Sequence, residues 1–220
     1  MLPPLTHLKE TPSQTAGPYV HIGLAPGAAG FAIYETELGQ DIAGPEAKGQ
    51  RIRIEGQVFD GTGTPLKDVL IETWQANADG IYAHPETPDR APSDGQKRVE
   101  PGFRGWGRAI SDFDTGGWQF ETVKPGSVPG RNGRIMAPHI NLWIVARGIN
   151  VGLNTRLYFE DEQDVNDADP VLALIEQTHR RSTLLARRKK PSDAGHKDLS
   201  LVYRFDIHLQ GSDETVFFDI

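Results

Sequence analysis

Short runs of alternating apolar and polar residues most constrain how this chain can fold. Successive side chains of a β-strand point to opposite faces, so an apolar period of two predicts a half-buried strand. Residues 201–210 (LVYRFDIHLQ) follow this period most clearly, and residues 50–58 repeat it at Ile52, Ile54 and Val58. Further strand-like runs occupy residues 68–76, 117–123, 139–147 and 155–159. Several short strands separated by turns predict a mainly β fold, an antiparallel β-sandwich.

The segments between these runs predict how the strands are connected. Residues 60–65 (DGTGTP) have turn chemistry, so residues 50–58 and 68–76 are expected to form a hairpin. Residues 77–116 are rich in Gly, Pro and Asp and predict a long loop. Near-helical apolar spacing over residues 169–190, which begins with Asp169 and Pro170, predicts one late helix. The basic residues 187–190 would then form the last turn of that helix.

The first quarter of the chain lacks the period-two pattern of the later segments. Residues 1–49 are rich in Gly, Pro and Ala and show no sustained apolar period. A structureless segment of this length is uncommon in a compact domain unless it is functional or bound to a partner. We therefore expect residues 1–49 to be an N-terminal arm that packs on a partner subunit, and residues 50–220 to be a single β-sandwich domain.

Composition excludes several classes of function. The 220 residues contain no cysteine, which excludes disulfides, cysteine–zinc sites, iron–sulfur clusters and a thiol nucleophile. The net charge of −7 argues against binding to nucleic-acid phosphates. No apolar run approaches the roughly 18–20 residues that span a bilayer, and the N-terminal residues do not resemble a secretory signal. We expect a cytoplasmic protein, since a chain without cysteine suits a reducing compartment.

One pair of polar residues suggests a metal site with a ligand missing. His139 and Asn141 lie two residues apart in a strand-like run, so their side chains are expected on the same face. A His-x-His pair in this arrangement would offer two nitrogen ligands to a metal. The neutral amide of Asn141 is a poor ligand by comparison. Taken alone, the pair predicts only a core histidine beside a polar residue.

Three segments occur in order along the chain: residues 74–82 (WQANADGIY), 111–126 (SDFDTGGWQFETVKPG) and 138–141 (PHIN). Their order and wording resemble the intradiol ring-cleavage dioxygenases. That family carries a W-x-A-N-x-x-G-x-Y segment, a D-x-x-G-x-Y segment and a P-A-H-I-H strand, and it binds Fe(III) through two tyrosines and two histidines. Phenolate oxygens and imidazoles are donors suited to ferric iron.

The resemblance is incomplete at the metal ligands. Tyr82 and His139 match one tyrosine and one histidine of the family, whereas Trp118 and Asn141 stand where the other two ligands are expected. Met136 replaces an arginine that the family carries three residues before the first histidine. The resemblance thus implies a vestigial iron pocket at these four ligand positions. It implies no metal ligand set and no catalytic residue in this chain.

One branch of the family is built from two homologous subunits, of which β holds the iron and α has lost it. From about residue 8 onward the chain resembles the α subunit, most specifically at residues 11–19, 144–150 and 203–207. The implied complex cleaves protocatechuate with O₂ to 3-carboxy-cis,cis-muconate, in the catabolism of aromatic compounds by the β-ketoadipate pathway. The implied cofactor is Fe(III) bound by the β subunit, and the implied partner is that homologous iron-binding β subunit.

The same resemblance implies that this chain lends residues to its partner's site. Gly17, Pro18 and Arg147 are implied to bind substrate at the interface with β, with Arg147 on the benzoate carboxylate. Arg147 lies eight residues beyond His139, which is about 26 Å along an extended strand. Arg147 is therefore expected to serve a neighbouring site and not the pocket around His139. Its planar fork suits a carboxylate, which it can bind through two hydrogen bonds.

Simpler interpretations remain open at this level. Tyr82 and His139 are equally consistent with packed core residues, Arg147 with a surface ion pair at a strand end, and residues 17–18 with a plain turn. One alternative function is a self-sufficient dioxygenase with unusual ligands, against which the losses at Trp118, Asn141 and Met136 argue. Another is a non-enzymatic β-sandwich binding module, against which the arm and Arg147 argue.

Overall fold

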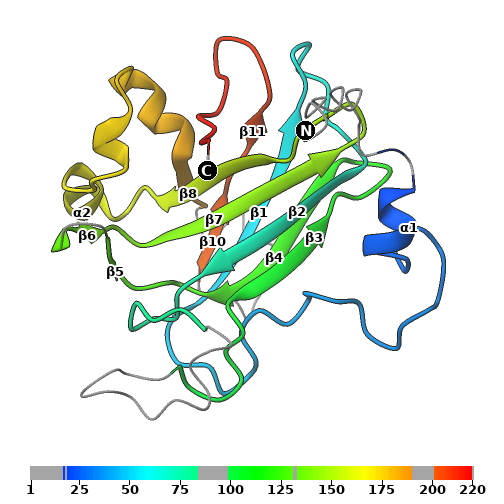
Figure 1. Cartoon of the computed structure of the whole chain (residues 1–220), viewed down its shortest axis with the longest axis horizontal. Coiled ribbons are helices and arrows are strands. Elements are labelled where there is room, and N and C mark those ends of the chain that lie inside the picture. The colour runs from blue at the N-terminus through cyan, green and yellow to red at the C-terminus, as the bar shows by residue number, and fades with distance from the viewer. Residues whose placement is uncertain (1–16, 18, 84–98, 131–132, 190–200, 220) are drawn as a thin grey trace, which may run out of the picture.

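The computed structural model describes residues 17, 19–83, 99–130, 133–189 and 201–219, and it is mainly β (Figure 1). The helical segments are short: α1 (Val20–Leu24), α2 (Gln163–Asp167) and the 3-10 turns η2 (Leu172–Leu174) and η3 (Thr178–Leu184). The strands are β1 (Arg51–Phe59), β2 (Val69–Gln75), β3 (Trp106–Ile110), β4 (Gly117–Val123), β5 (Val128–Pro129), β6 (Ile135–Met136), β7 (His139–Ala146), β8 (Leu153–Phe159), β9 (Leu185–Arg188), β10 (Leu201–Arg204) and β11 (Ile207–His208).

The strands form two halves that enclose one core. One half contains β4, β1 and β10, and the other contains β3, β2, β7 and β8, with β9 joining the two. Side chains from both halves meet in a single apolar cluster, which includes Ile54, Ile71, Trp118, Leu142 and Tyr203. Burial of this shared cluster is the main favourable contribution to folding. The prediction of a mainly β fold with a sandwich core is therefore confirmed.

The pairing of the strands differs from the sequence prediction in two ways. The predicted hairpin of β1 and β2 is wrong, because β1 pairs with β4, β10 and β11 while β2 pairs with β3 and β7. Both strands have an apolar face. The two strands lie in opposite halves of the sandwich, and the apolar face of each is buried in the shared core. In addition, the sheet is not wholly antiparallel, since β1 runs parallel to β10 and β11 and β8 runs parallel to β9.

The predicted helix over residues 169–190 is also absent, and two 3-10 turns and strand β9 take its place. Leu172 and Leu184 are both buried in one small cluster with Ala137 and Tyr158. In a straight helix these two leucines would lie about 18 Å apart. The chain folds back so that both reach the same cluster, and the basic residues Arg187 and Arg188 lie on β9 instead of a helix end.

The long loop predicted over residues 77–116 contains a strand, β3, that the period-two pattern did not reveal. Gly107 lies in this strand where a Cβ would come within 2.3 Å of Ile42, so the position has no room for the apolar side chain that would have marked it. Ile42 is 1% exposed and belongs to the main core. The last part of the predicted arm therefore packs on this chain's own sandwich.

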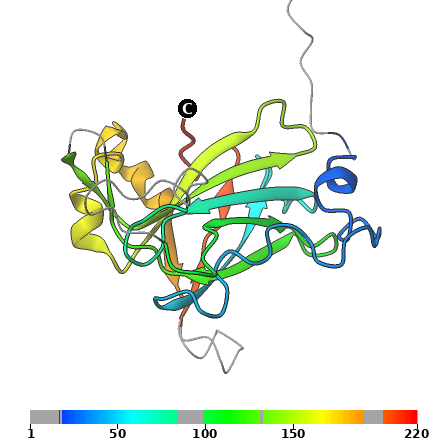
Figure 2. The ribbon, with the colours of Figure 1, turned by 60° about the horizontal axis from the view of Figure 1, so that its bottom comes forward.

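The rest of the described arm runs along the outside of the molecule (Figures 1 and 2). In both views α1 lies at one end of the sandwich, while α2 and the β5–β6 pair lie at the opposite end. Strand β7 runs from the α2 end toward the α1 end, so His139 and Ala146 mark the two ends. None of the helices in the described ranges is long and apolar enough to cross a membrane.

Candidate functional site

Three of the four residues predicted for the vestigial pocket lie together. Tyr82 follows β2 and is bridged to Ala76, while His139 and Asn141 are on the adjacent strand β7. The Tyr82 hydroxyl lies 3.3 Å from Nε2 of His139 and 3.5 Å from Nδ2 of Asn141. Asn141 also donates to the carbonyl of Trp74 at 3.2 Å. We call these three residues the Tyr82 cluster.

Hydrogen bonds fix the state of the histidine in this cluster. Nδ1 of His139 lies 2.7 Å from the carbonyl oxygen of Ala137, and a carbonyl only accepts, so Nδ1 carries the proton. Nε2 of the neutral ring then accepts from the Tyr82 hydroxyl. Burial, with a smaller contribution from the charge of Arg156, lowers the pKa of His139 to about 4. Burial raises the pKa of Tyr82. Both side chains are therefore neutral at neutral pH.

The structure does not bring Trp118 to the Tyr82 cluster, so its assignment to the vestigial pocket is wrong. Thr122 marks the end of β4 that approaches the cluster, because its hydroxyl donates to the side chain of Gln75 on β2. Gln75 pairs with Ile140, which lies between His139 and Asn141 on β7. Trp118 lies four residues earlier on β4, about 13 Å away along the strand. Its indole is 2% exposed in the main core and packs parallel to Phe120 at 6.0 Å. Trp118 is a core residue.

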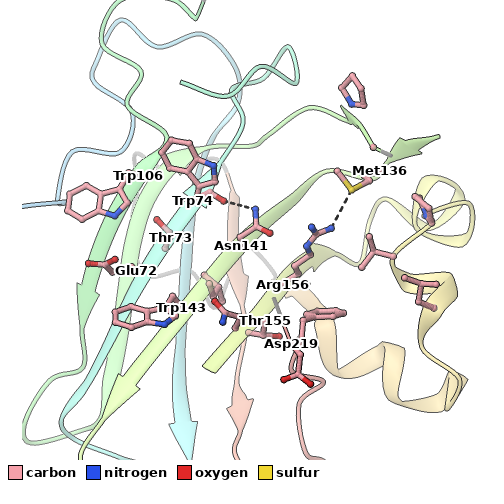
Figure 3. A pocket seen from close by; sticks show the side chains of 18 of the residues that line it. Glu72, Thr73, Trp74, Trp106, Met136, Asn141, Trp143, Thr155, Arg156 and Asp219 are labelled. Carbon is pink, nitrogen blue, oxygen red and sulfur yellow. Dashed lines mark hydrogen bonds between the residues drawn. The ribbon is translucent and has the colours of Figure 1, made fainter. Parts of the chain in front are cut away.

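Arg156 is a site residue that the sequence analysis missed. It lies on β8 directly opposite Asn141, which in turn lies opposite Trp74 on β2. The three side chains thus form a row across the outer face of the sheet, with Arg156 pointing toward Met136 (Figure 3). The guanidinium donates to Sδ of Met136 at 3.4 Å, and its charge acts on both His139 and Tyr82. The alternation of residues 155–159 would have placed Arg156 on a strand face, but only the register identifies its neighbours.

The Tyr82 cluster does not fit ferric iron. It offers one phenol with a raised pKa, one imidazole nitrogen and one amide, whereas Fe(III) prefers several anionic donors. The nearby guanidinium of Arg156 would repel a trivalent cation. Among the described residues there is also no group of three or more His, Cys, Asp or Glu side chains that could hold a metal.

A groove of about 1190 Å³ extends from this cluster over the outer face of β2, β7 and β8. Figure 3 shows the indoles of Trp74, Trp106 and Trp143 on one side of it and Arg156 on the other. Asn141 lies between them on the floor of the groove. The surface therefore combines flat apolar rings with one cation, which is the arrangement of a site for an aromatic anion.

Arg147 lies at the other end of β7, immediately after Ala146. Its Nε and Nη2 atoms are 2.8 and 2.7 Å from Oδ2 of Asp68, and its side chain is 63% exposed. The simple interpretation of a surface ion pair at a strand end thus describes its state in this chain. Arg147 does not contact the Tyr82 cluster, as the length of the strand predicted.

The first part of the arm lies at the same end as Arg147. His21 of α1 is buried against Phe113, with ring centres 5.5 Å apart. Burial lowers the pKa of His21, and the charges of Asp68 and Arg147 also act on it. Gly17 accepts a hydrogen bond from the first residue of α1, so it lies next to this group. Pro18, also predicted to bind substrate, is outside the described residues.

Comparisons with known proteins identify the family of this chain and agree with its fold. A family profile described as "Dioxygenase" matches residues 28–211. The protocatechuate 3,4-dioxygenase alpha chain of Pseudomonas putida is 48% identical over 216 residues, which cover 98% of this chain and 99% of that one. The beta chain of the Burkholderia cepacia enzyme is 33% identical over 172 residues, which cover 77% of this chain and 68% of that one.

A solved structure extends the likeness to the whole fold. The dioxygenase domain of a carbohydrate-binding fusion protein from Streptomyces sp. SirexAA-E superposes with a TM-score of 0.55 at 23% identity. The superposition covers 94% of this chain and all of that domain. At this identity the likeness concerns the fold alone, and the sequence relatives carry the assignment of family. This chain belongs to the intradiol ring-cleavage dioxygenase family of oxidoreductases.

Proposed function

We propose that this chain is the iron-free α subunit of a protocatechuate 3,4-dioxygenase. The observation that carries the proposal is the near full-length similarity to a Pseudomonas putida alpha chain, in a chain whose own Tyr82 cluster does not suit iron. The complex would open the ring of protocatechuate between its hydroxyls and insert both atoms of O₂, giving 3-carboxy-cis,cis-muconate. We propose a cytoplasmic location, which a chain without cysteine suits.

The proposed partner is a homologous β subunit that binds the Fe(III). The 33% identity to a beta chain supports this, because it indicates that the two kinds of chain share an ancestor and therefore a fold. Such a partner would retain the ligands that this chain lacks. In this division, the iron supplies the redox chemistry and our chain supplies groups that bind and orient the substrate.

The arm would form part of the interface with β. Among the described residues, six of the twelve large apolar side chains that are exposed lie between residues 19 and 38. A concentration of exposed apolar side chains of this kind marks an interaction surface. We retain residues 1–49 as the arm and residues 50–220 as the sandwich domain, with the burial of Ile42 indicating that the arm is anchored at its C-terminal end.

Arg147 would hold the carboxylate of protocatechuate in the partner's site, with Gly17 and Pro18 lining the same pocket. A guanidinium has five N–H donors, and the ion pair with Asp68 uses two of its nitrogens, so further donors remain for a substrate. Asp68 orients Arg147 and leaves its side chain exposed. Holding the carboxylate fixes the position of the two hydroxyls, and positioning of this kind can lower a barrier by several kcal/mol.

The decisive experiment compares this chain purified alone with the same chain co-expressed with the β subunit. Iron content and protocatechuate-dependent O₂ uptake are measured for both preparations. We expect the chain alone to be free of iron and inactive, and the co-expressed complex to be coloured and active. Stoichiometric iron with turnover in the lone chain would establish a self-sufficient dioxygenase instead. A β subunit that is equally active without this chain would support a separate binding module.

A further inference from the structure

The groove beside the Tyr82 cluster contains a cation without a matching anion. Among the described residues, Arg156 forms no ion pair with a carboxylate, and its guanidinium donates to the thioether of Met136 and to the neighbouring Tyr158 hydroxyl. A thioether is a weak acceptor, so most of the hydrogen-bonding capacity of the guanidinium is unused. A partly buried charge in this state is favourably placed to bind an anion.

The carboxylates nearest to the groove are already engaged or lie elsewhere. Glu72 is paired with Arg108 at 2.6 Å. Asp169 is wholly buried, and its oxygens accept from the backbone of Ala137, from the two backbone N–H groups after Pro170 and from the Tyr158 hydroxyl. Figure 3 shows Asp219 beside Thr155, away from the end of the Arg156 side chain. Within the described part of the groove, no carboxylate therefore pairs directly with Arg156.

The residues beside Arg156 in this row define the shape of the ligand that the groove could bind. Trp74, Asn141 and Arg156 occupy adjacent positions on three neighbouring strands, which places an indole about 10 Å from the base of the guanidinium side chain. Trp74 itself stacks on Tyr82, with ring centres 5.9 Å apart, so its orientation is fixed. Asn141 lies between the indole and the guanidinium and offers an amide oxygen. A planar ring with one carboxylate matches this row.

We propose that this groove is a metal-free binding site for an aromatic carboxylate, with Arg156 paired to the carboxylate and the ring placed against the tryptophans. The site is separate from the one proposed at Arg147, which lies at the opposite end of β7. The site does not require the partner subunit, so this proposal can be tested independently of the proposed function.

The test is a calorimetric titration of the full chain with benzoate, with uncharged benzamide of the same shape as the ligand control. We expect one benzoate per chain and at least about tenfold weaker binding of benzamide. Arg156→Gln should weaken benzoate by about tenfold or more, whereas Arg156→Lys should keep part of the affinity because it keeps the charge. Arg187→Gln removes the same charge from exposed β9 and should leave binding unchanged.

The same titration in the complex separates this site from the iron. Benzoate at the iron changes the visible spectrum, while benzoate in the groove does not, so calorimetry should count one more site than the spectrum reports. Arg156→Gln should remove the extra site and leave the spectral titration intact. The proposal is overturned if the folded chain binds no benzoate, if Arg156→Gln binds it as tightly as the unsubstituted chain, or if the complex shows only the iron-linked site.

Discussion

Lowering the pH is expected to destabilise this chain through His139. Its pKa is about 4 in the folded protein and 6.5 in a solvated histidine, because the ring is buried. Above pH 6.5 the ring is neutral in both the folded and the unfolded chain, so it does not make the free energy of unfolding depend on pH. Between pH 6.5 and about 4 the unfolded chain binds a proton that the folded chain does not, so the free energy of unfolding falls as the pH falls. The shift corresponds to a loss of about 3 kcal/mol, most of which has occurred by pH 4.

The assay is denaturant unfolding at a series of pH values for the unsubstituted chain and for His139→Gln, which cannot titrate. Other groups titrate in both proteins, so the contribution of His139 is the difference between the two curves. The difference should shrink by about 3 kcal/mol from neutral pH to pH 4. His179→Gln, at an exposed position, serves as the matched control. If the unsubstituted chain and His139→Gln lose stability in parallel over this range, the neutral buried state assigned to His139 is incorrect.

Three further outcomes follow from single contacts. Arg147→Ala in the complex should raise KM for protocatechuate about tenfold or more and leave KM for uncharged catechol nearly unchanged; an equal loss on both substrates would refute the carboxylate role. Asn141→His should not restore iron, because Arg156 remains beside the site, and stoichiometric iron in elemental analysis of that variant would contradict the charge argument. Gly56→Ala should cost about 2 kcal/mol or more and lower Tm, since its Cβ would lie 1.8 Å from the carbonyl oxygen of Phe205; an unchanged Tm would show that the two strands can separate freely.

Properties that depend on local residue identity were predictable from the sequence. The period-two runs at residues 50–58, 117–123 and 139–147 correspond closely to β1, β4 and β7, because alternate burial is a property of the strand itself. The expectation that Asn141 is a poor metal ligand also depends on residue identity alone, since an amide is a weaker donor than an imidazole. The family assignment rested on such identities and is confirmed.

Predictions that required knowledge of distant partners were less successful. The spacing of residues 169–190 favours a helix, yet the need to bury Leu172 and Leu184 in one cluster decided against it. A short turn between two strand-like runs favours a hairpin, yet β1 and β2 pair elsewhere. In each case the local preference is worth little compared with burial of apolar side chains in a shared core.

The sequence by itself determined that this chain is a β protein of the intradiol dioxygenase family, and it predicted an impaired set of iron ligands. Only the tertiary structure decided which residues surround the impaired site. Trp118 is near the expected position in the sequence but lies in the core, whereas Arg156 is fifteen residues from Asn141 and lies directly beside it. The physical reason is that strand register sets side-chain neighbours across a sheet, and register depends on how the whole sandwich packs.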